Sequence, residues 1–267
     1  MDTSLAHKLE LNSRKQKQAS RWIPIATLVL ALLIWALVAS LSGLPDFILP
    51  RPLQVWERFW RALIDGSLLW HTSVTLSEVL LGLLAGTVFA TLLGYFIAKS
   101  RMFERMISPF LVASQAVPIV AVAPLLVIWF GPGVVSKMLI CGLIVFFPVL
   151  VNTVVGLRAV PRSLYELMGS LRASRWQVFR QLEIPAALPV FLGGLRIGAT
   201  LSVIGGVVGE LIGANSGLGF LINVARGQYD MPLVFVAVLT LIALALFLYG
   251  IVVLLEKRFL GWQEIHS

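Results

Sequence analysis

The residues with the most chemical capacity gather in one polar segment, Arg158–Pro189, which lies between two long apolar runs. It carries an acid at Glu166 and five arginines, in a chain of which only 13% of the residues are charged. The arginines are Arg158, Arg162, Arg172, Arg175 and Arg180. Because arginine pairs well with acidic groups on a partner, the pattern predicts a docking element that faces water.

The same segment has the periodicity of short amphipathic helices. Leucine or methionine recurs at i, i+3, i+4 and i+7 over Leu164–Leu171. An apolar stripe resumes over Trp176–Leu182, after a short break near Ala173. The pattern predicts two short helices at the membrane face, each with an apolar side for a partner or for the rest of the protein.

Start and stop signals accompany these helices. Ser163 stands three residues before Glu166, the spacing of a capping box that would begin the first helix. Pro185 is expected to end the second helix, and Pro189 to lie in the first turn of the next span. The alternative is a basic loop that only sets membrane topology, which accounts for the arginines but not for the ordered pattern.

Composition places this segment in an integral membrane protein. The 267 residues are 58% hydrophobic, and the mean hydropathy is +0.92. Several apolar runs reach about 20 residues, enough to cross a bilayer core of about 30 Å as helices. The net charge of +8 lies mainly in the segments between these runs, so it does not indicate a nucleic-acid-binding protein. The single cysteine, Cys141, excludes an intrachain disulfide.

Hydropathy predicts an all-α protein with six transmembrane helices. The third and fourth are separated only by Gly131-Pro132-Gly133, which suits a tight reversal. The expected spans are residues 22–42, 74–98, 107–130, 134–157, 188–213 and 232–255. Residues 45–71, with Trp56, Phe59 and Trp60, predict an interfacial helix whose aromatic rings anchor at headgroup depth. Anchoring is the preferred interpretation over ligand contact.

The distribution of lysine and arginine predicts the orientation. With the N-terminus in the cytoplasm, fifteen of these residues fall inside and five outside, and Arg196 lies within the fifth span. The five outer residues are Arg51, Arg58, Arg61, Lys137 and Arg226. The positive-inside rule therefore places both termini and the polar segment in the cytoplasm. The first span is interpreted as a retained helix, with a cleaved signal peptide as the alternative.

The polar segment resembles the cytoplasmic signature of membrane permeases from binding-protein-dependent ABC importers, written E-A-A, three residues, G, nine residues, I-x-L-P. Glu166 matches the acid, Leu167-Met168 replace the two alanines, and Leu182–Pro185 matches the last element. Arg172 stands where the family has glycine. Ser114–Gly133 and Gly209–Ile222 are similar to the nitrate, sulfonate and taurine branch and its vitamin-transporting relatives. The resemblance covers roughly residues 74–255.

The resemblance implies a division of the chain and a set of partners. It implies a cytoplasmic tail (1–21), a first transmembrane helix (22–42), an extracytoplasmic segment (43–73), a permease core (74–255) with a cytoplasmic coupling loop (158–187) between the fourth and fifth helices, and a second tail (256–267). The chain has no G-x-x-x-x-G-K-[ST] motif, so ATP and Mg are expected on a separate ATPase and no cofactor on this chain. A solute-binding protein and a second permease copy or paralogue complete the expected complex. The chain itself is expected to be a transport subunit rather than an enzyme.

In this family a helix of the coupling loop sits in a groove of the ATPase. The resemblance therefore assigns ATPase coupling to Glu166, Leu167, Met168, Leu171, Arg172, Ala173, Ser174, Arg175, Trp176 and Pro185. A glycine at position 172 would permit close backbone approach, which arginine does not. Either the contact is looser in this protein, or Arg172 and Arg175 pair with acidic groups on the ATPase.

Few polar residues occur inside the predicted spans, and each is a candidate for the solute pathway. The candidates are Gln115, Pro118, Trp129, Asn152, Ser202 and Glu210. An acid within the membrane is by default a functional candidate, but Glu210 lies late in its span, where solvent or neighbouring backbone can satisfy it. Gln115, Asn152 and Ser202 fit a pathway or bonds between helices equally well.

Two further groups of residues have structural interpretations. Six glycines on the fifth span predict a helix-packing seam. They are Gly193, Gly194, Gly198, Gly205, Gly206 and Gly209. The histidines at positions 7, 71 and 266 are isolated, so no metal site is expected.

The solute is weakly specified by the sequence. Arg196 lies near the cytoplasmic end of its span, where it can snorkel, so no central cation favours an anion. Similarity to relatives that import riboflavin or a thiamine-precursor pyrimidine puts riboflavin first. Nitrate, an aliphatic sulfonate or taurine is the alternative solute. An ion-coupled secondary transporter is the alternative class, for which Glu210 would be the only acid considered.

Overall fold

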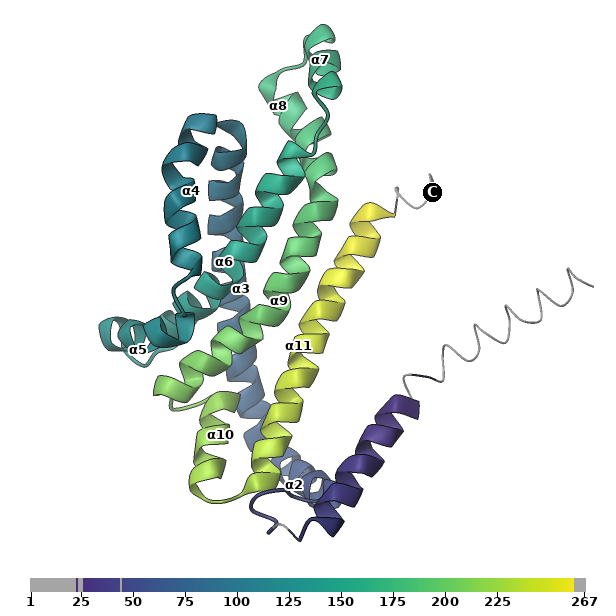
Figure 1. The fold of residues 1–267 in the computed structure, drawn as a ribbon, viewed down its shortest axis with the longest axis vertical. Helices are drawn as coiled ribbons and strands as arrows, with labels where there is room; N and C mark the ends of the chain where they lie inside the picture. Colours follow the sequence, from purple (N-terminus) through teal and green to yellow (C-terminus); the bar gives the residue numbers. More distant parts are fainter. Residues whose placement is uncertain (1–22, 24–25, 44, 262–267) are drawn as a thin grey trace, which may run out of the picture.

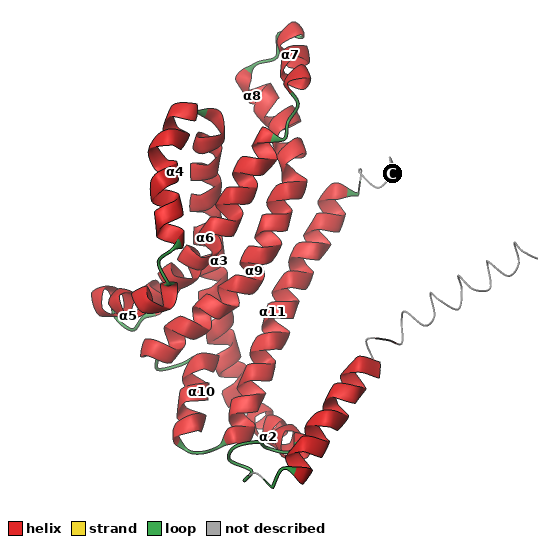
Figure 2. Ribbon diagram, in the orientation of Figure 1, coloured by secondary structure: helices red, strands yellow, loops and turns green. Residues whose placement is uncertain are grey.

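The protein is helical throughout the part that its structure describes. The computed structural model describes residues 23, 26–43 and 45–261, and these contain no β-strand (Figure 2). The N-terminal tail 1–21, residues 262–267 of the second tail, and with them His7 and His266, lie outside the described residues.

The helices follow one another with short connections. The first helix is Ala26–Leu41. The others are α2 (Pro52–Ile64), α3 (Ser67–Lys99), α4 (Arg101–Gln115), α5 (Ile119–Phe130), α6 (Val134–Arg158), α7 (Arg162–Ser170), α8 (Arg175–Val178), a π-helical turn η1 (Phe179–Glu183), α9 (Ile184–Gly213), α10 (Leu218–Gly227) and α11 (Met231–Leu260).

The long helices form an elongated bundle with two distinct ends (Figure 1). Helix α6 packs against both α3 and α9, and α11 packs against α9 on the other side. We call the end that carries α7 and α8 the α7 end, and the opposite end, with α2 and α10, the α10 end. The first helix meets the bundle beside α2 and leans away from α11.

Glycines hold α6 between its neighbours. A methyl group added at Gly86 of α3 would lie 2.6 Å from the carbonyl oxygen of Gly142 on α6. One added at Gly205 of α9 would lie 2.8 Å from the Cα of Cys141. Since these neighbours are backbone atoms, the helices meet at a distance that no larger residue allows. Methyl groups added at five of the six predicted seam glycines would meet backbone or side-chain atoms of α3 or α6, whereas one added at Gly193 would face open space.

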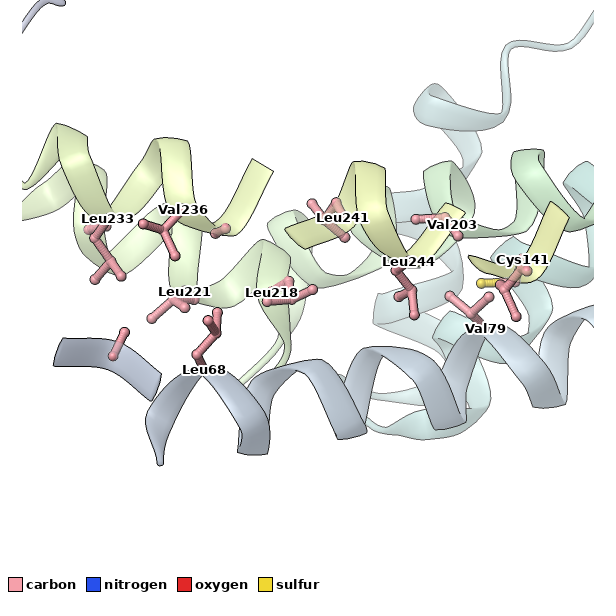
Figure 3. Close-up of a cluster of buried hydrophobic side chains, with 14 of the residues drawn as sticks. Leu68, Val79, Cys141, Val203, Leu218, Leu221, Leu233, Val236, Leu241 and Leu244 are labelled. Carbon is pink, nitrogen blue, oxygen red and sulfur yellow. The ribbon is translucent and has the colours of Figure 1, made fainter. Parts of the chain in front are cut away.

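A second packing centre lies toward the α10 end. Figure 3 shows Leu68 of α3 pointing toward Leu218 and Leu221 of α10. Leu233 and Val236 of α11 complete this group, and all five side chains are buried. The short helix α10 is therefore part of the packed protein and not a surface loop.

The predicted third span is not one helix. Ala116 and Val117 separate α4 from α5, and Pro118 is the N-cap of α5 with an extended backbone. Figure 1 shows α5 turned across the bundle at about its mid-height, while α4 runs beside α3. Proline disfavours helical conformation in the residue before it, which accounts for the break.

The predicted boundary before the fifth span is also wrong. Arg175–Gly213 is one continuous helical stretch of 39 residues, in which Pro189 is internal rather than in a first turn. In the π-helical turn the Ile184 N–H donates to the carbonyl of Phe179, five residues back. This wider turn directly before Pro185 accommodates the proline ring and its missing N–H. Pro185 therefore does not stop the helix.

By length and composition, four helices of the described residues can cross a membrane: Ser67–Lys99, Val134–Arg158, Arg175–Gly213 and Met231–Leu260. These helices extend past the bounds expected from hydropathy, because their polar end residues remain helical although they are not apolar. Six crossings and the cytoplasmic position of both termini remain predictions.

The glycine contacts lead to a paired test. Gly205→Ala should destabilise the protein by about 1–3 kcal/mol, because the added methyl meets the α6 backbone. Gly193→Ala should leave stability unchanged or slightly raised, since its methyl meets open space and alanine is the better helix former. Thermal stability in detergent checks both. An equal effect of the two changes would contradict the packing assigned to Gly205.

Candidate functional site

The segment Arg162–Val178, which contains α7 and α8, projects from the α7 end of the bundle (Figure 1). Helix α7 has no buried residue. Leu167, Leu171 and Trp176 are 54%, 69% and 65% exposed. Such a concentration of large apolar side chains on a short projecting segment is typical of a surface that another protein covers. We call Arg162–Val178 the coupling segment.

The structure brings the predicted coupling residues together in this segment, with one exception. Glu166, Arg172, Ser174 and Arg175 are exposed, and Met168 and Ala173 are half-buried. Pro185 lies outside the segment, half-buried in the second residue of α9. The exposed members form a mixed apolar and charged surface.

Arg172 occupies a backbone conformation that favours glycine. Its φ is +52°, in the left-handed region. The Ala173 N–H donates to the Met168 carbonyl at 2.9 Å and the Arg172 N–H to the Gly169 carbonyl at 2.9 Å. These two bonds are a Schellman motif, which closes α7 and turns the chain toward α8.

This geometry gives a further reason for the expected glycine. Position 172 needs a positive φ, since this residue reverses the chain between two helices. An L-residue there costs about 1–2 kcal/mol relative to glycine. Arginine is therefore held in a conformation that opposes it, and its side chain is free to project from the segment.

The first helix begins close to the predicted position, but without the predicted capping box. Helix α7 has Pro161 at its N-cap and no side-chain cap, so Ser163 and Glu166 form no capping box. A capping box forms at Ser174 instead, whose N–H donates to the Gln177 Oε1 at 2.7 Å while its Oγ accepts from the Gln177 N–H. Ser174 thus begins the long helix that runs to Gly213.

Charged contacts fasten both sides of the coupling segment to the bundle. Arg158, at the end of α6, donates to both oxygens of Glu104 at 2.7 Å and to the Ile97 carbonyl at 3.1 Å. Lys99 bonds Glu183 in the π-helical turn. Burial, and then the negative charge of Glu183, raise the pKa of Tyr165 on α7, so its phenol is neutral at physiological pH.

Glu210 lies in a buried cluster near the α10 end. Only 1% of it is exposed, so solvent does not satisfy it. One of its oxygens accepts from the Thr75 hydroxyl at 2.7 Å, and the other accepts from the Gly219 N–H at 2.5 Å. The Leu218 N–H donates to the Thr75 Oγ1 at 2.8 Å. Glu210 and Thr75 therefore cap the N-terminus of α10, where free amides and the helix dipole favour an anion.

The same region contains an ion pair that the sequence interpretation missed. Lys137 of α6 bonds Glu78 of α3 at 2.8 Å, and both side chains are at most 4% exposed. Lys137 is thus buried in the bundle and does not belong to an outer loop. Glu210 was not the only acid available, because Glu78 falls inside the predicted second span. An acid within that apolar run was the signal that could have found it.

The remaining pathway candidates do not form one group. The Ser202 hydroxyl is buried and donates to the Ala199 carbonyl of its own helix, and the Asn152 amide donates to the Pro148 carbonyl. The side chains of Ser202 and Asn152 therefore form hydrogen bonds within their own helices. Gln115 and Pro118 are exposed at the break before α5, and Trp129 is 67% exposed at the far end of α5. The described residues contain no cluster of three potential metal ligands.

An apolar cavity of about 490 Å³ lies between the first helix, α2, α3 and α11. Its two threonines, Thr72 and Thr240, donate to carbonyls of their own helices. The cavity therefore has little to offer a polar solute, and we do not include it in the site.

Residues 79–261 match the family described as the inner membrane component of binding-protein-dependent transport systems. The chain belongs to this family. A riboflavin transport system permease, RibX of Chloroflexus aurantiacus, is 48% identical over 89% of this chain and 88% of the relative. The formylaminopyrimidine permease ThiX of Halalkalibacterium halodurans is 36% identical over 90% and 96%. The taurine permease TauC of Escherichia coli is 34% identical over 95% and 96%.

Membership of this family makes the protein an inner-membrane permease component of an ABC importer. The match spans the coupling segment, Glu210, α10 and the glycine contacts among α3, α6 and α9, but neither Thr75 nor the first helix.

The cap of α10 can be tested at one carboxylate. Glu210→Gln removes one of two acceptors, so a donor at Thr75 or Gly219 loses its partner, at about 1–3 kcal/mol. Amide hydrogen exchange at residues 217–221 should become about tenfold faster. Glu57→Gln, an exposed change on α2, is the control. Unchanged exchange in the Glu210 variant would contradict the capping role.

Proposed function

We propose that this protein is the permease subunit through which an ABC importer carries riboflavin, or a related vitamin or precursor, under the control of a separate ATPase. The observation that carries the proposal is the exposed coupling segment, with the family signature, on a chain 48% identical to a riboflavin permease. The exposed apolar face fits a groove on another protein, and the surrounding arginines fit acidic groups beside it.

The proposed orientation places the α7 end in the cytoplasm. The end of α11, with Lys257 and Arg258, lies toward that end of the bundle, and α2 lies at the opposite end (Figure 1). Moving Lys137 from the outer loops into the bundle leaves four outer basic residues instead of five. The correction therefore strengthens the charge asymmetry.

The coupling segment is built to transmit movement. It is joined directly to α6 on one side, and on the other it continues into the stretch that ends at Gly213. When an ATPase dimer closes, a displacement of α7 would tilt both long helices and alternate the access of the pathway. We place that pathway at an interface with a second permease, beside the exposed apolar faces of α4 and α5. Phe110 and Ile128 on these faces are 76% and 74% exposed.

The electrostatics of the bundle favour an uncharged ring system over an anion. Lys137 and Arg196 lie within the described spans, and each has an acidic partner: Lys137 pairs with Glu78, and Arg196 pairs with Glu256 of α11. Arg196 also lies over the ring of Tyr249, so it is engaged by α11 rather than snorkelling. Neither cation is left unpaired to attract a sulfonate or nitrate.

The alternatives follow the relatives. The 36% identical permease is named for formylaminopyrimidine and the 34% identical one for taurine. A thiamine-precursor pyrimidine is therefore the second solute to test, and taurine, an aliphatic sulfonate or nitrate the third. Ion coupling would require Glu210 or Glu78 to titrate during transport, whereas the structure engages them as a helix cap and an ion-pair partner.

Uptake of labelled riboflavin tests the solute and the coupling segment together. Cells with this permease, its ATPase and its binding protein should accumulate riboflavin, and ATP depletion should abolish uptake while collapse of the proton gradient should not. Glu166→Lys should lose uptake with the permease still in the membrane, because it reverses the charge of an exposed residue on α7. Glu57→Lys, the same change at the α10 end, should retain it.

The outcomes separate the two parts of this prediction. Absence of riboflavin uptake with intact expression would reject this solute and direct the assay to the pyrimidine and then to the anions. Uptake that is indifferent to Glu166→Lys would show that this acid is not needed for coupling.

Two variants of Arg172 distinguish the effect of its backbone conformation from the effect of its charge. Arg172→Gly suits the φ of +52° but removes the charge, whereas Arg172→Glu reverses it. If Arg172 pairs with an acidic group on the ATPase, the reversal should weaken co-purification by at least about tenfold, and the glycine variant should be intermediate. Wild-type co-purification of both variants would reject the pairing.

A further inference from the structure

The coupling segment and α3 are not neighbours along the chain, since α4, α5 and α6 lie between them. It is joined to α6 through Ala159–Pro161 and to α9 through the π-helical turn. Helix α7 buries none of its residues. Any movement of the coupling segment that reaches α3 directly must therefore pass through side-chain contacts.

Lys99 is one of the α3 side chains that make such contacts, beside Tyr95, whose ring centroid lies 5.5 Å from that of Phe179 in η1. Lys99 is the last residue of α3, and its ammonium bonds the carboxylate of Glu183 in η1. The same ammonium lies 5.2 Å from the ring centroid of Tyr165 on α7 and 5.7 Å from that of Tyr95 on α3. Both distances are in the range of cation–π attraction. Lys99 thus connects α3 with α7 and η1, which lie far from it in the sequence.

The π-helical turn places Glu183 where Lys99 can reach it. The adjacent residues Arg180 and Gln181 are exposed, whereas Glu183 is only 2% exposed. Its second oxygen, Oε2, is buried and has no hydrogen-bond partner. Separating Lys99 from Glu183 would leave a buried carboxylate without its cation, which is strongly unfavourable. The pair is therefore expected to move as a unit.

We propose that Lys99 is a positioning residue that links the coupling segment to α3, so that displacement of α7 moves α3 together with α6 and α9. This inference rests on the proposed function, because it needs an ATPase to displace α7. The contact joins α3 to elements that are not its neighbours along the chain. Helix α3 also carries Thr75 and Glu78, so the link joins the ATPase side to the buried cluster near the α10 end through one continuous helix.

The test separates transmission of movement from simple charge burial. Lys99→Met leaves Glu183 alone in the interior, whereas Lys99→Met with Glu183→Leu removes both charges. The charge-swapped double variant Lys99→Glu with Glu183→Lys rebuilds the pair. Lys257→Met, which removes an exposed lysine from α11, is the matched control.

Two readouts are taken on the complex of full-length permease and ATPase. The first is amide hydrogen exchange at residues 93–99 of α3 with and without ATP and Mg, which needs no solute. The second is stimulation of ATP hydrolysis by riboflavin-loaded binding protein. The apolar double variant should assemble with the ATPase, lose the ATP-dependent change in α3, and show stimulation reduced by about tenfold. The swapped variant should recover both, and the control should match wild type.

The outcomes are distinct from those for the proposed function. If the apolar double variant keeps the ATP-dependent exchange change, the pair only neutralises buried charge and the inference is overturned. If wild type shows that change without stimulation by riboflavin, and the apolar double variant loses it, the link stands and the proposed solute is rejected. If wild type shows no change in α3 when ATP binds, the link is rejected as well.

Discussion

Everything in this structure depends on how closely α6 can approach α3 and α9. In a bilayer, apolar side chains gain little by leaving lipid for protein, so helices associate through close packing and buried polar contacts. The glycines at positions 86, 142 and 205 bring backbone against backbone, and this proximity allows side chains to meet across helices. Lys137 reaches Glu78, and Thr75 reaches α10, because the helices that carry them are already in contact.

The non-helical connections of the chain are limited by the same bilayer environment, because their backbone amides need hydrogen-bond partners. Within a membrane, a backbone amide that has no partner in its own helix must find another hydrogen-bond acceptor in the protein, because lipid supplies none. At the start of α10 the Leu218 and Gly219 amides are satisfied by Thr75 and Glu210, and the Gly217 amide by the ring nitrogen of His71. The polar residues near the α10 end therefore serve first to make a non-helical connection possible.

Much of the architecture could be predicted from apolar runs, because length and hydropathy decide which segments form long helices. The errors concern residues whose role depends on their neighbours in space. Proline usually ends a helix, but the π-helical turn before Pro185 lets the helix continue through it. Lys137 follows a turn and resembles a loop residue until Glu78 is placed opposite it. Arg172 departs from its signature in composition, yet its backbone keeps the conformation that glycine provides.

The uninterrupted helical stretch from Arg175 to Gly213 has a mechanical consequence. At 1.5 Å per residue its 39 residues extend about 58 Å. A rigid lever of that length, pivoting near one end, converts a tilt of about 5° into a displacement of about 5 Å at the other. Under the proposed function, leverage of this kind would turn a modest push on the short helix α7 into a displacement of several ångströms at the far end of α9.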